Sequence, residues 1–292
     1  MTNSRVKIYK TLKTYYDFLS KNYRVLFIGI YGSQNYNLDD ENSDIDAKAI
    51  VLPTLKDIIN KRSIKKIISM ETGEIAVFDL MSYYQIIKKG NPAFIEPLHS
   101  KYKLGDKTLI NYLAKNKVNQ LACYGMMMQK CHALNHPYPS KLEIIAKFGY
   151  DPKQYHHIIR LWDLISLNDE TKSFIEYNNL ADTHYMKTIK RCGDNKPYDE
   201  VFKNSQLLCE KARDKLKDYK FKPIQDDDSF IELYIEKELK KLLVMKQNDI
   251  FVRKVRTFDD GIPKSDLKKF KKLEEYKDKD VSYLVYEALE IL

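Results

Sequence analysis

The feature that most constrains this chain lies in residues 31–46, where an apolar run ends in Gly-Ser and a polar loop leads to two nearby aspartates. The apolar run, residues 23–31, is rich in Val, Ile and Phe and is short enough for a buried strand. Asp44 and Asp46 lie two residues apart on a second predicted strand, residues 44–52, so both side chains leave it on one face. Two carboxylates that close repel each other unless a cation lies between them. The segment therefore predicts a divalent-metal site beside a turn that ends a strand.

The turn itself suits a phosphate group. Gly32 allows close approach of the backbone, and Ser33 adds a hydroxyl that can reach a phosphate oxygen. No Gly-Lys-Ser/Thr follows, so this is not a Walker loop. A third carboxylate normally helps to bridge two metal ions. Asp79 is the best candidate because an acid flanked by Phe and Leu at the end of a predicted strand needs a reason; Glu74, at the other end of that strand, is the alternative.

Charge and composition narrow the class of protein. Residues 1–150 hold 22 Lys and Arg against 13 Asp and Glu, whereas residues 151–292 hold 28 against 28, so the first half carries the whole net charge of +9. A basic region beside a metal site favours a polyanionic substrate such as a nucleotide or RNA, although a solvated Lys-rich surface would look the same. No apolar run approaches the ~18–20 residues of a membrane helix.

The expected cellular setting is the cytoplasm. The first residues are polar and show no signal-peptide core, and the four cysteines form no CxxC pair, which favours reduced thiols. A composition rich in Lys, Asn, Ile and Tyr is typical of an AT-rich genome, such as that of a phage acting in its host's cytoplasm. Nothing in the sequence indicates an oligomeric state.

The order of elements predicts an α/β half followed by a helical half. Strands are expected over residues 23–31, 44–52, 64–70 and 74–80, and helices over 4–20, 53–60, 82–89, 107–134, 141–148, 171–191, 198–220 and 229–245, with further helical starts at Asn91-Pro92 and Asp151-Pro152. We predict three parts: a catalytic domain over 1–105, a helical domain over 106–222 and a C-terminal helical extension over 223–292.

The helix that starts near Pro152 has a basic stripe. Lys153, His157 and Arg160 are spaced i, i+4 and i+7, so they share one side, with apolar residues opposite. An ordinary amphipathic helix with solvated charges gives the same pattern. If the stripe faces the metal site, Arg160 and Lys153 would bind phosphate and His157 would bind phosphate or transfer a proton. The neighbouring His156 leaves open which histidine matters.

Three blocks of residues together resemble a known family. The chain resembles the DNA polymerase β superfamily of nucleotidyltransferases and, within it, the predicted RlaP-type enzymes associated with RNA-repair ligases. The resemblance covers residues 25–165 well and 185–220 faintly. The matching positions are Gly32, Ser33, Tyr36, Leu38, Ser43, Asp44 and Asp46, then Gly90, Asn91, Pro92, Glu96, Pro97 and Leu98, then Gly149, Tyr150, Asp151, Lys153, His157 and Arg160.

The resemblance implies a polymerase-β-like fold with a small mixed sheet and a metal-dependent transfer of NMP from an NTP, ATP first, to an acceptor hydroxyl on an RNA or tRNA end. Asp44, Asp46 and Asp79 would be catalytic and would bind Mg²⁺ or Mn²⁺. The nucleotide would be held by Gly32, Ser33, Lys153, His157 and Arg160. Two alternatives stay open at this point: nucleotidylation of a protein or small molecule, and a non-catalytic nucleotide- or RNA-binding module.

Overall fold

The structure, a computed structural model, describes residues 3–40, 43–166, 183–191, 196–223 and 228–256. The chain divides into two compact units, residues 1–226 and residues 227–292. The finer division of the first unit at residue 105 stays a prediction. The part of the predicted helix 171–191 that precedes residue 183, and the last thirty-odd residues, lie outside the described residues.

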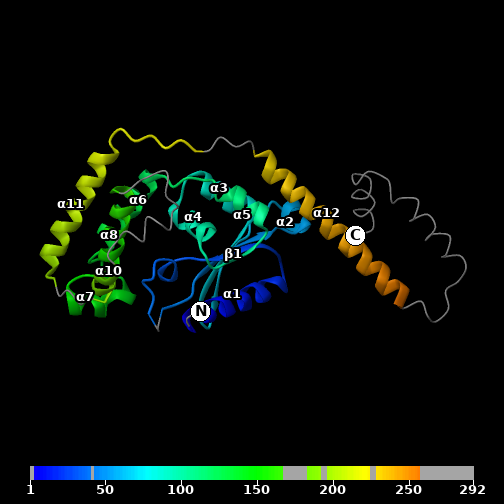
Figure 1. The fold of residues 1–292 in the computed structure, drawn as a ribbon, viewed down its shortest axis with the longest axis horizontal. Coiled ribbons are helices and arrows are strands. Elements are labelled where there is room, and N and C mark those ends of the chain that lie inside the picture. Colours follow the sequence, from blue (N-terminus) through cyan, green and yellow to red (C-terminus); the bar gives the residue numbers. More distant parts are fainter. Residues whose placement is uncertain (1–2, 41–42, 167–182, 192–195, 224–227, 257–292) are drawn as a thin grey trace, which may run out of the picture. The chain divides into compact units, whose positions relative to one another are not determined.

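A five-stranded mixed sheet forms the centre of the N-terminal half (Figure 1). The strand order is β3-β4-β2-β1-β5, in which β2 and β4 run parallel and the other neighbours run antiparallel. The strands are β1 (Arg24–Ile30), β2 (Ala47–Leu52), β3 (Lys65–Met70), β4 (Gly73–Asp79) and β5 (Lys103–Gly105). The predicted α/β fold with a small mixed sheet is confirmed.

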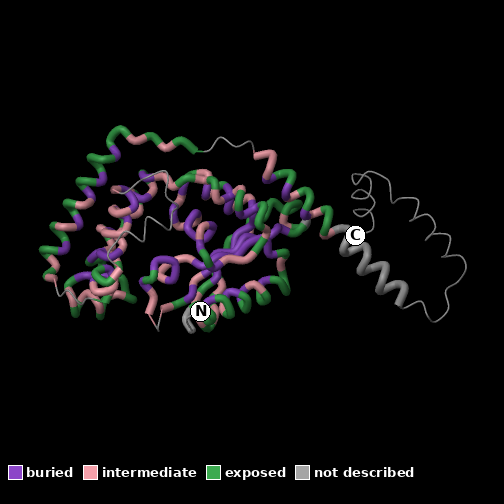
Figure 2. Tube along the Cα trace, viewed as in Figure 1, coloured by how far each residue is buried: buried purple, intermediate pink, exposed green. Residues whose placement is uncertain are grey.

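Helices cover both faces of this sheet. The helix α1 (Asn3–Ser20) buries Ile8, Leu12, Tyr15 and Leu19 against Ile28, Ile30, Ala47, Ala49, Ile75 and Val77 of the strands. On the opposite face lie α3 (Leu80–Lys88) and α4 (Pro92–His99), which contact β1, β2 and β4. The strands β1 and β2, in the middle of the sheet, are accordingly almost wholly buried, whereas the edge strand β3 is mostly exposed (Figure 2). The short helix α2 (Leu55–Ile59) follows β2.

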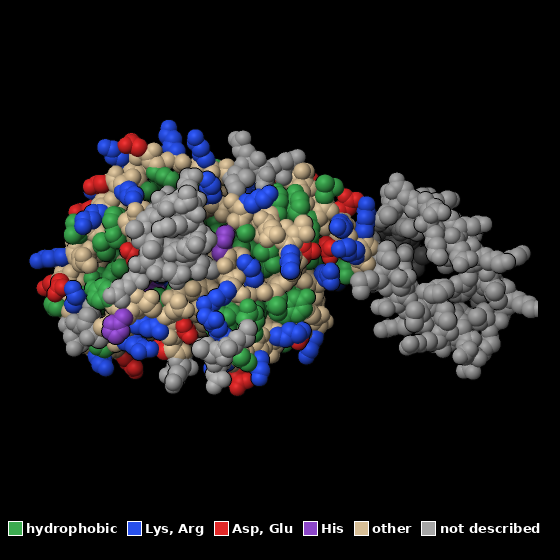
Figure 3. Space-filling view, in the orientation of Figure 1, with side chains coloured by type: hydrophobic (Ala, Val, Ile, Leu, Met, Phe, Trp, Pro, Cys, Tyr) green, Lys and Arg blue, Asp and Glu red, His purple; other side chains and the backbone are tan. Residues whose placement is uncertain are grey.

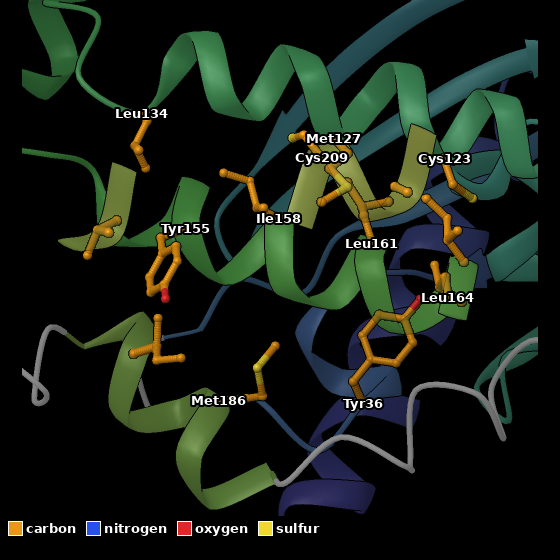
Figure 4. Close-up of a cluster of buried hydrophobic side chains, with 14 of the residues drawn as sticks. Tyr36, Cys123, Met127, Leu134, Tyr155, Ile158, Leu161, Leu164, Met186 and Cys209 are labelled. Atoms are coloured by element: carbon orange, nitrogen blue, oxygen red, sulfur yellow. The ribbon is translucent and has the colours of Figure 1, made fainter. Parts of the chain in front are cut away.

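Beyond residue 106 every regular element in the described residues is a helix. The helix α8 (Pro152–Ser166) lies at the centre and packs on α6, α10 and α11. Tyr36 and Leu38, from the loop after β1, enter the hydrophobic cluster of these helices, which is separate from the cluster between α1 and the sheet. Figure 4 shows Tyr36 among the helical side chains. The other helices are α5 (Lys107–Leu113), α6 (Gln120–Ala133), α7 (Leu142–Phe148), α10 (Thr183–Lys190) and α11 (Tyr198–Leu216), and two 3₁₀ turns are η1 (Ser33–Asn35) and η2 (Pro139–Lys141).

Three expectations about elements were wrong. The single helix expected over 107–134 is two helices, because the Asn119 side chain accepts a hydrogen bond from the Leu121 N–H and starts α6 afresh. Strand β5, which closes one edge of the sheet, was not predicted. The second strand begins at Ala47 rather than at residue 44, so the two aspartates precede it instead of lying within it.

In the second unit, α12 (Ser229–Arg256) is a single long helix. Among the described residues no helix combines the length and apolar character needed to cross a membrane. Cys123, Cys131 and Cys209 are free thiols, and Cys192 lies outside the described residues.

Candidate active site

The Gly-Ser turn after β1 presents its backbone to open space. Gly32 has φ 90° and ψ −146°, a conformation that only glycine adopts readily. A Cβ placed on Gly32 would meet no atom within 4 Å. The glycine is therefore required by the backbone angles and not by crowding, and a ligand can approach the main chain closely there.

A buried carboxylate holds this turn from the other side. Glu96 of α4, only 4% exposed, accepts hydrogen bonds from the Gly32 N–H at 2.6 Å and from the Asn35 side-chain amide at 3.0 Å. The Tyr36 hydroxyl is also hydrogen-bonded to Glu96, and burial, followed by the Glu96 charge, raises the pKa of Tyr36 well above its usual value. The Gly32 N–H is thus already occupied, which leaves close approach and the Ser33 hydroxyl as the turn's means of holding a phosphate.

Asn35 ties the same turn to the sheet. Its amide nitrogen donates to the Ile30 carbonyl at 2.9 Å, and its side-chain oxygen accepts from the Ser100 hydroxyl at 2.7 Å. Because Asn35, Glu96 and Ser100 are all buried, these polar groups are satisfied by one another. No pattern in the sequence singles out Asn35 or Ser100, whereas Glu96 belongs to the second of the blocks that resemble the family.

Asp44 and Asp46 flank the buried Ile45 in the segment that leads into β2. Asp44 is exposed and Asp46 is half-buried. The Gln34 side-chain amide donates to the Asp44 carbonyl, and the Tyr31 N–H donates to the Asp46 carbonyl at 3.1 Å. The structure therefore brings both aspartates beside the Gly-Ser turn, as the sequence predicts.

Asp79 does not join them, so the strand register does not support the expectation that it is the third metal ligand. In the parallel pairing of β2 and β4, Asp79 lies opposite Val51. Val51 is five residues beyond Asp46, which at about 3.3 Å per residue is roughly 16 Å along the strand.

The Asp79 carboxylate is also fully engaged elsewhere. It accepts from the Ile64 N–H at 2.7 Å, from the Ser82 hydroxyl at 2.7 Å and from the Ser82 N–H at 2.8 Å. Asp79 is the N-cap of α3, which explains why an acid stands between two apolar residues at this position.

Glu74 is the acid that the sheet places beside Asp46. It follows Gly73 at the start of β4, and its backbone N–H donates to the Asp46 carboxylate at 3.1 Å. Ile75 faces the α1 core, so Glu74 leaves β4 on the opposite face, the one that also carries Asp46. Burial, followed by the charges of Asp46, Glu74 and Glu96, raises the pKa of the Tyr31 phenol to about 12, which fits acids gathered on this face.

The three acids do not yet form a closed metal cage. Within the described residues, no three His, Cys, Asp or Glu side chains gather closely enough to hold an ion by themselves. Two strand-end carboxylates in an open position nevertheless fit Mg²⁺, which usually takes one or two protein carboxylates and completes its shell with waters and substrate phosphates. The donor set is all oxygen, which Mn²⁺ also accepts.

Lys48 lies two residues beyond Asp46 on the same face. It is 6% exposed, and its Nζ lies 3.1 Å from the centroid of the Tyr31 ring and 5.3 Å from that of Phe94. Burial lowers the pKa of Lys48 to about 8, and the charges of Glu96 and Asp46 oppose this shift. The amine is thus held against aromatic rings by cation–π contact beside two acids.

The basic stripe of α8 approaches the turn through Arg160. The helix begins as predicted, with the Asp151 carboxylate accepting from the Lys153 N–H at 2.9 Å. The Arg160 guanidinium lies 4.4 Å from the centroid of the Tyr36 ring. Lys153 is exposed, and His157 is partly buried. Burial, followed by the charge of Arg160, lowers the pKa of His157 well below its usual value, so this imidazole is neutral at pH 7.

Comparison with known proteins places the chain. Residues 5–161, more than half of it, match the family described as the RNA repair pathway DNA polymerase beta family, RlaP. The chain belongs to this family. The matched residues include the turn, both aspartates, Glu74, Glu96 and α8 as far as Leu161. Membership makes the chain a polymerase-β-like nucleotidyltransferase, as the sequence blocks had indicated.

Other comparisons add little to this. No curated protein matches the chain. A solved structure, a nucleotidyltransferase-like protein from Exiguobacterium sibiricum 255-15, is 11% identical over 82% of this chain and 92% of that one, with a TM-score of 0.28.

Proposed function

We propose that this chain transfers a nucleoside monophosphate from a nucleoside triphosphate, ATP first, to a hydroxyl at an RNA or tRNA end, with release of pyrophosphate. The observation that carries the proposal is that the backbone at Asp44 and Asp46 is hydrogen-bonded to residues on either side of the Gly-Ser turn, where a Cβ on Gly32 would meet open space. In this proposal Glu74 has the role that was expected of Asp79.

The residues divide the task between them. Asp44 and Asp46, with Glu74 beside them, would hold Mg²⁺ or Mn²⁺. A divalent ion bound there would make the acceptor hydroxyl easier to ionise and would offset charge on the phosphates. Gly32 and Ser33 receive the β- and γ-phosphates, and Glu96 keeps the turn in the required shape. Arg160 lies over the ring of Tyr36, whose hydroxyl is bonded to Glu96, and Arg160 and Lys153 would contribute positive charge and His157 a neutral N–H to phosphate binding.

The bond changes follow from this arrangement. The acceptor hydroxyl releases its proton to water, and its oxygen forms a bond to the α-phosphorus. The bond between the α-phosphorus and the bridging oxygen of the β-phosphate breaks, and pyrophosphate leaves with that oxygen. Positioning and charge supply most of the catalysis in such a transfer, which is why a rigid turn beside the carboxylates matters.

The surface charge supports a polyanionic acceptor. In the view of Figure 3, Lys and Arg side chains lie over much of the first unit and acidic side chains are fewer. Residues 101–150 alone hold 8 Lys and Arg against 2 Asp and Glu. A nucleic-acid backbone gains from such a surface, and its binding weakens as salt rises.

The test is incubation of the full chain with α-³²P-labelled nucleotides, Mg²⁺ and total RNA, followed by separation on a gel. Label in RNA, lost in Asp46→Asn and in samples treated with a chelator, is the expected result. Label only in protein would assign a protein acceptor instead. Nucleotide binding with no pyrophosphate release from any mixture would show a binding module and overturn the proposal.

A further inference from the structure

Four cationic side chains lie on three helices that pack together, α8 with α6 and α8 with α10. They are Lys130 of α6, Lys153 and Arg160 of α8, and Lys190 of α10. Burial, followed by Lys153 and Arg160, lowers the pKa of Lys130. Burial lowers the pKa of Lys190 too, with Asp40 opposing and Lys153 adding to the shift. Lys153 thus influences both Lys130 and Lys190, and the side chains of Lys190 and Arg160 both contact the loop of residues 36–38. We call the four residues the cation cluster.

Acids nearby do not cancel this charge. Asp151 is the acid that favours the charged form of Lys130, but it already pairs with Lys141 at 3.3 Å and caps α8. Asp40 and Asp39 favour the charged form of Lys190, but Asp40 already pairs with Arg191 at 3.3 Å, and two acids do not offset Lys190 together with Lys153 and Arg191. The cation cluster is therefore left with excess positive charge in a partly buried place, where like charges destabilise the fold unless an anion offsets them.

Buried polar groups at the same place lack partners. His156 is 3% exposed, and neither ring nitrogen has a hydrogen-bond partner. The Nε of Arg160 is likewise buried without a partner. Burial, followed by Arg160, Lys190 and Lys153, lowers the pKa of His156 to about 3, so its ring is neutral and still offers one N–H. Unsatisfied buried groups are rare in folded proteins and require an explanation, such as a ligand.

The cation cluster lies against the turn's own loop. Lys190 donates to the Leu38 carbonyl at 3.1 Å, and Arg160 lies over the Tyr36 ring. Tyr36 in turn is bonded to Glu96, which holds Gly32. An anion bound here would therefore be part of whatever complex forms at the turn.

We propose that Lys130, Lys153, Arg160 and Lys190, with the His156 N–H, bind a terminal phosphoryl group. This rests on the proposed function for the setting, and it adds Lys130, His156 and Lys190 to the residues that contact substrate. A terminal phosphate is a dianion with three acceptor oxygens, which matches several cations and an unpaired guanidinium N–H better than a single carboxylate does. Such a group is present both at the end of a nucleoside triphosphate and at a phosphorylated strand end.

The experiment measures phosphate binding without metal, so that binding to the cation cluster is tested independently of nucleotide transfer. Binding to the full chain is measured by calorimetry in EDTA, with tripolyphosphate as one probe and a 5′-phosphorylated oligoribonucleotide, compared with its 5′-hydroxyl form, as the other. Lys130→Gln and Lys190→Gln are compared with Lys203→Gln, which removes an exposed cation on α11. Circular dichroism checks that each variant is folded.

We expect the two cluster variants to weaken binding about tenfold, and Lys203→Gln to leave it unchanged. If the cluster variants bind tripolyphosphate more weakly, the site holds the terminal phosphate of the nucleoside triphosphate. If only binding of the phosphorylated oligoribonucleotide weakens, the site holds the phosphate of the acceptor strand. Equal affinity in all variants, or no measurable binding of either probe, would overturn the assignment. Because the assay needs no turnover, a chain that binds phosphate yet transfers no nucleotide would contradict the proposed function and leave this site standing.

Discussion

Glu96 accepts a 2.6 Å hydrogen bond from the backbone N–H of Gly32, although the two residues are 64 positions apart. This contact joins α4 to the turn at the end of β1, and it uses an amide that would otherwise be free to bind phosphate. The Glu96 carboxylate therefore fixes the conformation of the turn without itself contacting a ligand bound there. Glu96 is in this sense a positioning residue.

Replacing Glu96 tests that role. Glu96→Ala leaves the Gly32 N–H and the Asn35 amide without an acceptor, and a buried unpaired donor costs about 1–3 kcal/mol. Glu96→Gln keeps an acceptor oxygen and should lose less stability. We expect KM for the triphosphate to rise in both variants, and more in the alanine, as measured by steady-state kinetics and thermal unfolding. Glu210→Gln, at an exposed position on α11, is the control. An unchanged KM in Glu96→Ala would show that the turn keeps its shape without this carboxylate.

Substitutions at Asp79 and Glu74 should have different effects, the first on stability and the second on activity. Asp79→Ala removes the N-cap of α3 and leaves the Ile64 N–H unpaired, so unfolding should become easier by about 1–2 kcal/mol. The folded fraction should keep its kcat. Glu74→Gln should do the opposite, lowering activity about 10- to 100-fold with little change in stability. Denaturant unfolding and single-turnover rates measure the two effects. If Asp79→Ala lowered kcat and Glu74→Gln did not, Asp79 and not Glu74 would be the third catalytic acid.

Gly32→Ala tests the turn's backbone. A methyl group at residue 32 has space, but φ 90° with ψ −146° is strained for alanine by about 1–3 kcal/mol. We expect a lower melting temperature and weaker triphosphate binding, because the turn must relax out of its present shape. Gly125→Ala is a matched control: it also meets open space, lies within α6, and should stabilise the chain by up to about 1 kcal/mol. Equal effects in the two variants would show that the turn has no special backbone requirement.

The sequence predicted some of these features for reasons that are local. The strand, the Gly-Ser turn and the Asp151 cap are each encoded within a few residues. The choice between Asp79 and Glu74 is not local, because it depends on whether β2 and β4 run parallel. Antiparallel pairing would have brought Asp79 near Asp46, whereas parallel pairing brings Glu74. An Asp before a helix also gives the same pattern whether it caps the helix or binds metal.

The hydrogen bond between Glu96 and the Gly32 N–H could not be predicted from the sequence either. It links residues from separate elements, and its partners Asn35 and Ser100 show no spacing that would identify them. Burial of Lys48 between two rings likewise arises from packing of β2 against α4, and no periodicity in the sequence reports it.

Lys48 gives the protein a stability that depends on pH. Its pKa is lowered by burial from 10.5 to about 8, so between pH 8 and 10.5 the unfolded chain binds a proton that the folded chain does not. Stability therefore rises with pH across this window. Below pH 8 the Lys48 amine is charged in both the folded and the unfolded chain, and burying that charge lowers the free energy of unfolding by on the order of 3 kcal/mol.

Lys48→Met removes the titrating group and keeps an unbranched chain between the rings. We expect the unfolding free energy of the wild type to rise relative to that of the variant by about 3 kcal/mol between pH 7.5 and 10.5. Urea titrations at several pH values measure it. Lys66→Met, on the exposed edge strand β3, should leave the pH dependence as it is in the wild type. A parallel pH profile for wild type and Lys48→Met would mean that the amine remains charged in the folded protein, held by Glu96 and Asp46 despite its burial.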